Sequence, residues 1–359
     1  MALQEYKCPC CAGAIEFNAY AQKLKCPYCE TEFEISALQQ YYQDVETDGN
    51  DDMNWETQQD TWRPGETDGM RVYTCQSCGG EIIADETTGA THCPYCDNPV
   101  VMSGQFSGAM RPEYVIPFKL DKEAAKKGLR DHLLNKKFLP RVFKDDNHIN
   151  EVKGVYVPFW LFDSDAEGGA RYRATRRHSH TEGNYRVTET EHFHVYREGR
   201  IRFENVSIDG SSKMPDDLME SIEPFNFAEA VPFQTAYLAG YLADKYDVTS
   251  DQTMERANTR VRKSIDEQFR STVTGYDSVT SEGSNIRLQN AKAKYALYPV
   301  WVLTTSWNGQ NYLFGMNGQT GKFVGNLPCD KTLYRNAFLK VFAIAAVIVY
   351  GLGWLFGRG

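Results

Sequence analysis

The sequence lacks the short motifs that mark the common enzyme active sites. Its 359 residues contain no glycine-rich phosphate loop, no nucleophile-elbow serine and no His-Glu-x2-His zinc-protease motif. These absences remove nucleotide hydrolysis, serine-dependent acyl transfer and zinc-dependent proteolysis from consideration. We therefore expect no enzyme, no catalytic residues, no organic cofactor and no small-molecule substrate.

Positive charge is scarce where a nucleic acid would need it. The net charge is −9, and the acids concentrate between residues 44 and 69, where nine acidic side chains accompany a single basic one, Arg63. A protein that neutralises few phosphates gains little affinity for DNA or RNA. Nucleic acid is therefore not an expected partner, and a transcription- or replication-linked factor that binds nucleic acid is the alternative hypothesis.

What the sequence does contain is a four-cysteine cassette that occurs twice. Each copy is a Cys-x2-Cys pair, fourteen further residues and a second Cys-x2-Cys pair, and the copies are offset by 67 residues. The match extends beyond cysteine, because Tyr6, Gly13, Ile15 and Pro27-Tyr28 recur as Tyr73, Gly80, Ile82 and Pro94-Tyr95. Recurrence at a fixed spacing indicates a duplicated structural unit.

The cysteine spacing is typical of zinc ribbons. A two-residue gap lets a tight turn aim two sulfurs at one ion, and fourteen residues suffice for a hairpin that returns the second pair. Four thiolates at about 2.3 Å then close a tetrahedron around Zn²⁺ with no open position, so the ion would be structural. We predict two structural Zn²⁺ ions held by Cys8, Cys11, Cys26, Cys29, Cys75, Cys78, Cys93 and Cys96.

Two disulfides per cassette are the alternative to zinc. No secretory signal precedes Cys8, so we expect a reducing compartment, in which thiolate ligands persist and disulfides are rare. Cys10 and Cys329 fall outside the cassettes, and their roles stay open.

A long apolar run near the C-terminus predicts a membrane span. Residues 337–356 carry one charge, Lys340, and twenty helical residues span about 30 Å, the hydrocarbon thickness of a bilayer. Lys331 and Arg335 lie just before the run, whereas only Arg358 follows it, which favours a cytoplasmic N-terminal side. We expect a single-pass protein of the cell membrane with the bulk of its chain in the cytoplasm; a buried core helix is the alternative.

Composition divides the rest of the chain into an α+β arrangement. We expect zinc ribbon 1 at residues 1–36, an acidic flexible linker at 37–70, zinc ribbon 2 at 71–102, an α+β body at 111–330 and the transmembrane helix at 337–356. The linker begins with a short helix at residues 36–43 and carries Trp55 and Trp62, for which docking to a partner is one interpretation.

The body combines strands and helices in a mixed, mainly antiparallel sheet. We predict a helix over 121–135, a strand over 155–162, three antiparallel strands over 170–207 with turns at 181–184 and 197–200, helices over 237–247 and 250–272, and hairpin turns at 308–309 and 317–318. Ile116-Pro117-Phe118 is echoed by Val231-Pro232-Phe233, and residues 158–161 are echoed by 299–302. These echoes indicate a body that is itself duplicated.

Two clusters in the predicted strands admit more than one interpretation. His178, His180, His192 and His194 flank one turn and would form a metal site if the register brought them together; exposed strand histidines are the simpler interpretation. Eight arginines and no lysine lie within 171–202, and this face would suit anionic lipid headgroups, an acidic partner segment, or ordinary cross-strand ion pairs.

Several of these segments together resemble a known family. The paired Cys-Pro-Tyr-Cys ribbons, the 116–118 and 157–161 anchors, the 237–243 segment and the Met316–Lys322 turn resemble the membrane-anchored, TFIIB-type zinc-ribbon proteins of Gram-positive bacteria. The resemblance implies protein partners of the SPFH type or like phage-shock protein A, and a role in placing them at the membrane. We therefore expect an adaptor or scaffold that localises protein partners at the cytoplasmic face of the cell membrane, in a membrane-stress response.

Overall fold

The computed structural model describes residues 7–11, 13–46, 51–105, 109–134, 136–145, 149 and 151–356. The fold is α+β, as expected, with one candidate apolar helix at the C-terminus. It divides into two compact units that each collect separate stretches of the chain. Unit 1 comprises Met1–Asn54, Ser164–Phe203 and Asn258–Ala291; unit 2 comprises Trp55–Asp163, Glu204–Ala257 and Lys292–Gly359.

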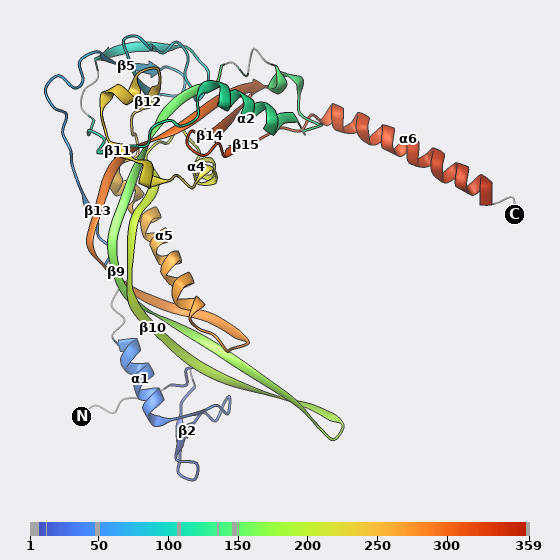
Figure 1. The fold of residues 1–359 in the computed structure, drawn as a ribbon. Helices are drawn as coiled ribbons and strands as arrows, with labels where there is room; N and C mark the ends of the chain where they lie inside the picture. Colours follow the sequence, from blue (N-terminus) through green and yellow to red (C-terminus); the bar gives the residue numbers. More distant parts are fainter. Residues whose placement is uncertain are drawn as a thin grey trace. The chain divides into compact units, whose positions relative to one another are not determined.

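Three long strands supply the framework (Figure 1). β9 is Lys153–Glu182, β10 is Tyr185–Asp209 and β13 is Ser278–Trp307; β9 lies between β13 and β12 in the sheet and also pairs with β10. In unit 2, residues 155–162 of β9 are buried throughout, so this part reads as a continuous apolar run rather than an alternation. The predicted strand over 155–162 is therefore confirmed as part of a longer one.

Short strands complete the sheet of unit 2. They are β4 (Glu56–Thr57), β5 (Met70–Cys75), β6 (Glu81–Asp85), β7 (Val100–Gln105), β8 (Tyr114–Val115), β11 (Val231–Pro232), β12 (Leu242–Asp244), β14 (Gln310–Asn317) and β15 (Phe323–Gly325). The predicted turns at 308–309 and 317–318 are confirmed, since β13, β14 and β15 form two antiparallel hairpins there. β8, which directly precedes the 116–118 anchor, pairs with β11, which contains the first two residues of the 231–233 anchor, and β9 and β13 are neighbours.

Two helices of unit 2, α2 (Lys122–Leu134) and α4 (Asp216–Ile222), pack on its sheet. α2 begins after Asp121, whose carboxylate accepts a bond from the amide of Ala124 at 2.8 Å, a normal N-cap. Its buried residues Ala125, Leu129 and Leu133 recur every four positions and pack in one cluster with Trp301 and Phe314. The helix is confirmed; Asn135, its expected last residue, lies outside the described residues. Unit 2 also contains the helix α6 (Lys331–Phe356).

α5 (Ser250–Ser271) confirms the predicted long helix, and the boundary between the units falls within it. In unit 1 its buried residues Val261, Ile265 and Phe269 recur every four positions and so lie on one face of the helix. Three short 3-10 helices complete the described helical structure: Arg141–Lys144, Phe227–Glu229 and Thr235–Leu238.

The acidic segment after ribbon 1 is not a free linker. α1 occupies Ile35–Glu46, longer than the predicted helix, and β4 pairs in parallel with β13. The Trp55 ring is buried and packs edge-on against Phe162 with 5.0 Å between centroids. The prediction of a flexible linker over 37–70 is therefore wrong for the described residues 51–70, and Trp55 serves the core rather than a partner; residues 47–50 lie outside the described residues.

Arg111 explains how so many acids tolerate an ordered conformation. Its guanidinium, 9% exposed, binds Asp60 at 3.0 Å and Glu66 at 2.9 Å. The Glu66 contact holds the pKa of that carboxyl below its usual value. Repulsion between the acidic side chains of the tract is thus partly offset by Arg111, which lies outside the tract in sequence. The composition of the tract alone cannot reveal this contact.

Two further predictions about the body are wrong. Residues 237–247 form the end of a 3-10 helix and strand β12, not a helix, because Gly240 adopts a left-handed φ of +82° and β12 is taken into the sheet between β9 and β6. The expected turn at 197–200 is also absent: β10 runs straight through, since Gly199 lies against Phe269 instead of bending the chain. Two strands, not three, therefore cover 170–207, joined at the predicted 181–184 turn.

Candidate metal centres

The first four-cysteine group lies in the three-stranded ribbon of β1 (Glu16–Asn18), β2 (Lys23–Lys25) and β3 (Glu32–Phe33). Sγ atoms of Cys8 and Cys29 lie 3.5 Å apart, as do those of Cys11 and Cys26, and all four fall within 4.8 Å of one another. The prediction that these four cysteines converge on one point is confirmed.

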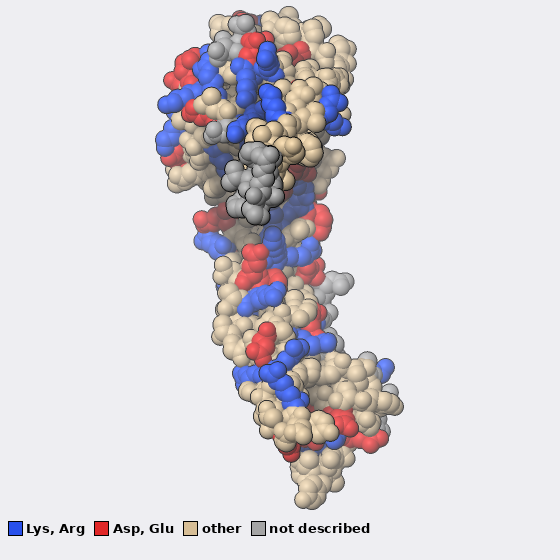
Figure 2. Space-filling view, turned by 90° about the vertical axis from the view of Figure 1, so that its right-hand side faces the viewer, with Lys and Arg blue, Asp and Glu red and all other residues tan. Residues whose placement is uncertain are grey.

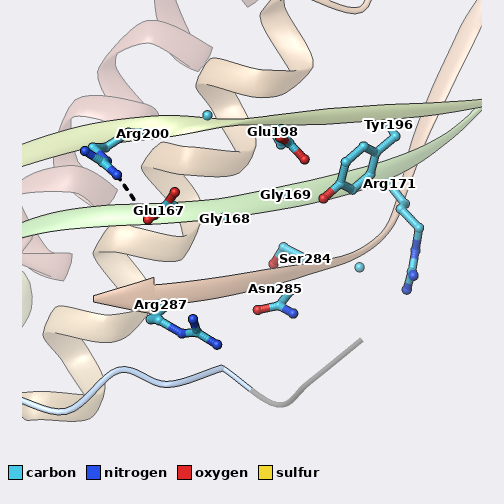
Figure 3. A pocket seen from close by; sticks show the side chains of 12 residues that line it. Glu167, Gly168, Gly169, Arg171, Tyr196, Glu198, Arg200, Ser284, Asn285 and Arg287 are labelled. Atoms are coloured by element: carbon cyan, nitrogen blue, oxygen red, sulfur yellow. Dashed lines mark hydrogen bonds and ion pairs between the residues drawn. The ribbon is translucent and has the colours of Figure 1, made fainter. Parts of the chain in front are cut away.

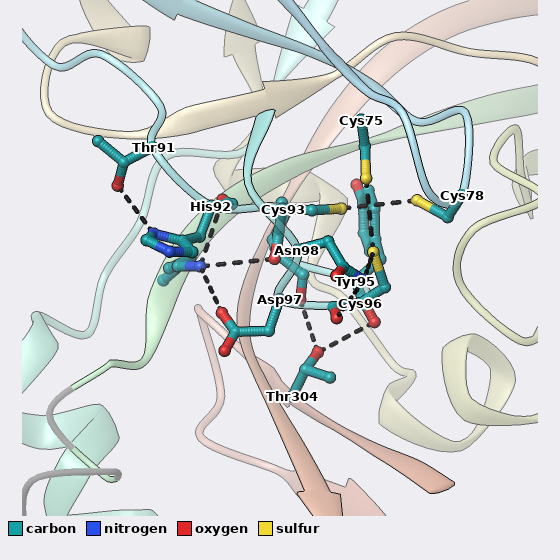
Figure 4. A network of polar contacts seen from close by, with 12 residues as sticks. Cys75, Cys78, Thr91, His92, Cys93, Tyr95, Cys96, Asp97, Asn98 and Thr304 are labelled. Atoms are coloured by element: carbon teal, nitrogen blue, oxygen red, sulfur yellow. Dashed lines mark hydrogen bonds and ion pairs between the residues drawn. The ribbon is translucent and has the colours of Figure 1, made fainter. Parts of the chain in front are cut away.

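The second group repeats this geometry within the sheet of unit 2. Sγ atoms of Cys75 and Cys96 are 3.5 Å apart and those of Cys78 and Cys93 are 3.6 Å apart, again with all four within 4.8 Å (Figure 4). β5 ends at Cys75, and the turn after it presents Cys78 to the pair formed by Cys93 and Cys96. Four sulfurs thus converge from two turns, as in the first group.

The two-residue gaps work because each Cys-x2-Cys turn has the same backbone hydrogen bonds. The amide of the first cysteine donates to the carbonyl five residues later: Cys8 to Gly13, Cys26 to Thr31, Cys75 to Gly80 and Cys93 to Asn98, at 2.7–3.0 Å. Three of the turns close further through an amide-to-carbonyl bond from residue 30, 79 or 97 back to the first cysteine. The local backbone therefore shapes each half-site.

The residue after the second cysteine of these turns must adopt a left-handed conformation. φ is +60° at Glu30, +70° at Gly79 and +58° at Asp97. Only Gly79 occupies this region without strain, while a non-glycine residue there is held by the surrounding bonds. Ala12, at the equivalent place in the first turn, lies outside the described residues.

Both groups fit a tetrahedral metal ion. Sulfurs bound at about 2.3 Å in a regular tetrahedron lie about 3.8 Å apart, close to the 3.5–3.6 Å found between the paired sulfurs. A disulfide requires about 2.05 Å, and all eight cysteines are free, so the alternative of paired disulfides is wrong. Four thiolates are the donor set of Zn²⁺ or iron–sulfur sites.

One thiol in each group is already biased toward the thiolate. A hydrogen bond from the Thr31 side chain, with one from its amide, lowers the pKa of Cys29 to about 6. Burial opposes ionisation of Cys96, but bonds from Asn98 outweigh it and bring its pKa to about 7. Thr31 and Asn98 occupy equivalent positions of the repeat, 67 residues apart, and each lowers the pKa of the last cysteine in its group. The spacing of the cysteines alone does not reveal this shared role.

The two centres differ in what surrounds them. Cys75, Cys93 and Tyr95 belong to the main apolar cluster of unit 2, and the β13 hydroxyl of Thr304 donates to the carbonyls of Pro94 (2.7 Å) and Tyr95 (3.2 Å). No sequence signal distinguishes Thr304, which lies about 210 residues downstream. Ribbon 2 is therefore built into the body: β6 pairs with β12, so the expected boundary between 71–102 and 111–330 is not a boundary of the fold.

Ribbon 1 is exposed where ribbon 2 is buried. Tyr28, the counterpart of buried Tyr95, is 75% exposed, and Phe17 and Tyr20 are exposed as well. Cys11 and Cys29 are also open to solvent. The same cassette thus serves once as part of a core and once as a small unit with aromatic side chains on its surface.

The histidines beside the 181–184 turn do not converge. Among the described residues, only the two cysteine groups bring three or more potential ligand atoms together. His194 contacts Glu282 at 3.1 Å and His178 lies 3.6 Å from Glu191, so these imidazoles meet carboxylates instead of one another. The hypothesis of a histidine metal site is not supported by this register.

The arginine-rich strands carry cross-strand ion pairs. Arg173 donates to Glu282 at 2.7 Å and Arg200 to Glu167 at 3.3 Å, while Arg176 stacks over Phe193. Lys and Arg lie intermixed with Asp and Glu on the face shown in Figure 2. The ordinary interpretation of this face, a solvated sheet with ion pairs, accounts for these contacts.

A shallow hollow of about 530 Å³ lies on these strands in unit 1 (Figure 3). Glycines from three strands line it: Gly168 and Gly169 of β9, Gly199 of β10 and Gly283 of β13, which leave backbone uncovered beside Tyr196. The rim carries both positively charged arginines and negatively charged glutamates, and Arg200 pairs with Glu167 across it. Mixed charge and an open form give it no evident preference for one ligand class.

The two remaining cysteines contribute to neither centre. Cys10 is half-buried beside the first group, and burial raises the pKa of its thiol. Cys329 is exposed just before α6.

α6 could cross a membrane. An 18-residue window within Lys331–Tyr350 has a mean hydropathy of 1.6, and none of that window is buried within the described structure. The alternative of a buried core helix is therefore wrong for this stretch. Arg358 lies outside the described residues.

Comparison with known proteins gives one informative match. The chain is 34% identical to the uncharacterized protein YdjG of Bacillus subtilis (strain 168) over 308 aligned positions, covering 72% of this chain and 90% of the relative. The chain belongs to the YdjG family. No family model matches it, and no solved structure is significantly similar. This member of the YdjG family has two features that bear on function: the two four-cysteine groups and the apolar helix α6.

Proposed function

We propose that the protein is a zinc-binding adaptor, anchored in the cell membrane by α6, that holds protein partners at the cytoplasmic face. Four thiolates complete the coordination of each ion, so Zn²⁺ would have no open position for substrate and would stabilise the fold. Such closed sites give the metal a structural role and favour a binding function for the ribbons. The expected content is two zinc ions per chain, to be measured by plasma mass spectrometry.

The observation that carries the adaptor proposal is the exposed aromatic surface of ribbon 1. Phe17 is 51% exposed, Tyr28 75%, and Tyr20 fully exposed. Aromatic residues dominate the energetics of protein interfaces, and a small rigid unit that presents several of them is suited to bind another protein. Protein partners of the SPFH type or like phage-shock protein A, implied by the TFIIB-type family resemblance, remain the proposed class, with a membrane-stress response as the proposed setting.

Membrane attachment by α6 has a physical basis in its exposure. Val341, Ile344 and Val347 are each more than 60% exposed, so apolar side chains face outward around the helix. Such a surface is costly in water and favourable in a bilayer. Lys331 and Arg335 before the span favour the orientation with the ribbons in the cytoplasm.

The test is crosslinking and capture from membranes that contain the full chain. The variant Tyr20→Ala/Tyr28→Ala should lose specific protein partners, while Tyr185→Ala, which removes an equally exposed tyrosine on β10, should retain them. Equal zinc content in all three proteins would show that the ribbons are intact. Partners that survive loss of both ribbon tyrosines would sink the proposal.

We also propose that the body arose by duplication. The support is that β8, which leads into 116–118, pairs with β11, and that β9 and β13, which contain 158–161 and 299–302, are neighbours in the sheet. Superposition of residues 114–161 on 231–302 should align these strands; a superposition that matches only one of the two pairs would contradict it.

A further inference from the structure

A pocket of about 330 Å³ in unit 2 has a lining of one charge sign. It lies between the loop 88–92, the start of α2, residues 152–154 at the beginning of β9 and the segment 240–242. Its ionisable lining residues are Lys122, Lys153, His92 and Tyr241, and no carboxylate is among the described residues that line it. In this it differs from the hollow on the arginine-rich strands, where glutamates are present.

Lys122 is the basic group of the pocket that is available to bind an anion. Its ammonium makes no ion pair or hydrogen bond in the described structure, whereas neighbouring Lys126 pairs with Glu123 at 2.6 Å. Burial and then the positive charge of Lys126 lower the pKa of Lys122, with a smaller effect in the same direction from Lys153. Glu123 acts in the opposite direction but pairs with Lys126, so the ammonium of Lys122 itself has no ion-pair partner among the described residues.

Lys153 is only loosely engaged. Its Nζ lies 3.4 Å from Asp97, 3.3 Å from the carbonyl oxygen of His92 and 3.5 Å from that of Cys93. Charge-assisted bonds are normally about 2.7–2.9 Å long, so this ammonium can accept a closer anionic partner. The Thr91 hydroxyl, 3.2 Å from His92 Nδ1, lies at the same loop and adds a neutral donor.

The floor of the pocket is aromatic and rigid. Tyr241 stacks on Phe118 with ring centroids 4.2 Å apart and planes inclined by 4°. A side chain at Gly154 would approach Tyr241 to 2.6 Å and Trp301 to 3.2 Å, so glycine is what lets the strand lie against these rings. A flat aromatic surface beside the two lysines Lys122 and Lys153 suits a ligand that joins an apolar group to an anion.

The pocket adjoins the second metal centre. Figure 4 shows Thr91 and His92 on the loop that leads into Cys93. Through its contact with the Cys93 carbonyl, Lys153 links the pocket to the same turn. A ligand bound here would therefore rest against a turn that the metal holds in place.

We propose that this pocket binds a phosphate monoester. Two lysines match a dianion, lysine is an established point-charge partner of phosphate, and hydroxyl and imidazole donors can satisfy further phosphate oxygens. The aromatic floor accepts the organic part of the ester. The ester is either the headgroup of an anionic lipid or a soluble metabolite, which share this chemistry. The site is independent of the adaptor role and of the surface of ribbon 1.

The test is calorimetric titration of the full chain in detergent with phenyl phosphate. Lys122→Gln should weaken binding about tenfold or more, the size expected for one lost charge-assisted bond. Lys122→Arg, which keeps the charge, should retain most of the affinity. Lys127→Gln is the matched control: it removes the same charge from the next turn of α2, at an exposed residue outside the pocket, and should change nothing.

A competition experiment distinguishes a lipid headgroup from a soluble ester, and the titrations can refute the proposed phosphate site. If the natural ester is a lipid, nanodiscs that contain phosphatidic acid should compete with phenyl phosphate and phosphatidylcholine nanodiscs should not; if it is soluble, neither should compete. Either outcome supports the pocket. Absence of saturable binding to the parent chain, or equal losses in Lys122→Gln and Lys127→Gln with unchanged zinc content, would overturn it.

Discussion

Asp244 of β12 is a carboxyl group in an unusual setting, since only 2% of it is exposed. Burial raises its pKa to about 7, although a hydrogen bond from Ser211 acts in the opposite direction. The charged groups around it are of both signs: Asp247 raises the pKa further and Lys213 lowers it, with Tyr95 close by. A buried group of this kind makes the stability of unit 2 depend on pH.

The direction of this dependence follows from proton binding. An unfolded aspartate has a pKa of about 3.9, so between about pH 4 and 7 the folded state holds the extra proton. The free energy of unfolding should therefore fall as pH rises through this window, by at most about 4 kcal/mol. Asp244→Asn should flatten the dependence, whereas Asp68→Asn, at an exposed position, should leave it. Denaturant titrations at several pH values measure it; an unchanged slope in Asp244→Asn would contradict the assignment.

Among the elements, the hairpin of β9 and β10 changes character along its length. Residues 155–162 are buried, but 177–182 and 188–192 are exposed. A two-stranded ribbon with few buried contacts opens easily. Amides of 177–192 should therefore exchange with deuterium much faster than those of 155–162, measured by mass spectrometry of peptides. Equal protection along β9 would show that another surface covers the tip.

α6 makes a second element-scale prediction. Ile344→Arg places a charge near the middle of the apolar stretch, which costs about 2.5–3.5 kcal/mol in membrane insertion. Thr332→Arg, near the start of the helix where an arginine reaches the interface, should cost little. Carbonate extraction of membranes should release a larger fraction of Ile344→Arg than of Thr332→Arg. Equal retention of both would argue against a span.

At the scale of the whole molecule, ribbon 2 and the body are one folding unit. Cys75, Cys93 and Ile82 share an apolar cluster with Val155 and Val300. A fragment of residues 111–330 lacks this part of the core and exposes the edge of β12, so it should not fold cooperatively. A fragment of residues 55–330 should show a sharper thermal transition by circular dichroism. Cooperative unfolding of the shorter fragment would show that ribbon 2 is dispensable.

Local patterns predicted the elements whose cause is local. The eight cysteine ligands, the helices α2 and α5 and the hairpin turns at 181–184, 308–309 and 317–318 were all evident from spacing, periodicity and turn residues. Errors arose where a distant contact decided the outcome. Residues 51–70 are acidic, yet Trp55 packs against Phe162 and Arg111 forms ion pairs with Asp60 and Glu66.

By itself, the sequence determined the two four-cysteine sites and the apolar C-terminal helix, because each depends on residues close together in the chain. Only the tertiary structure decided the fate of each cassette. The strands that surround Cys93, together with Thr304 of β13, bury the second copy, while Tyr28 of the first stays exposed. The physical reason is that burial depends on residues from distant parts of the chain, and the spacing of the cysteines, which is the same in both cassettes, does not depend on those residues.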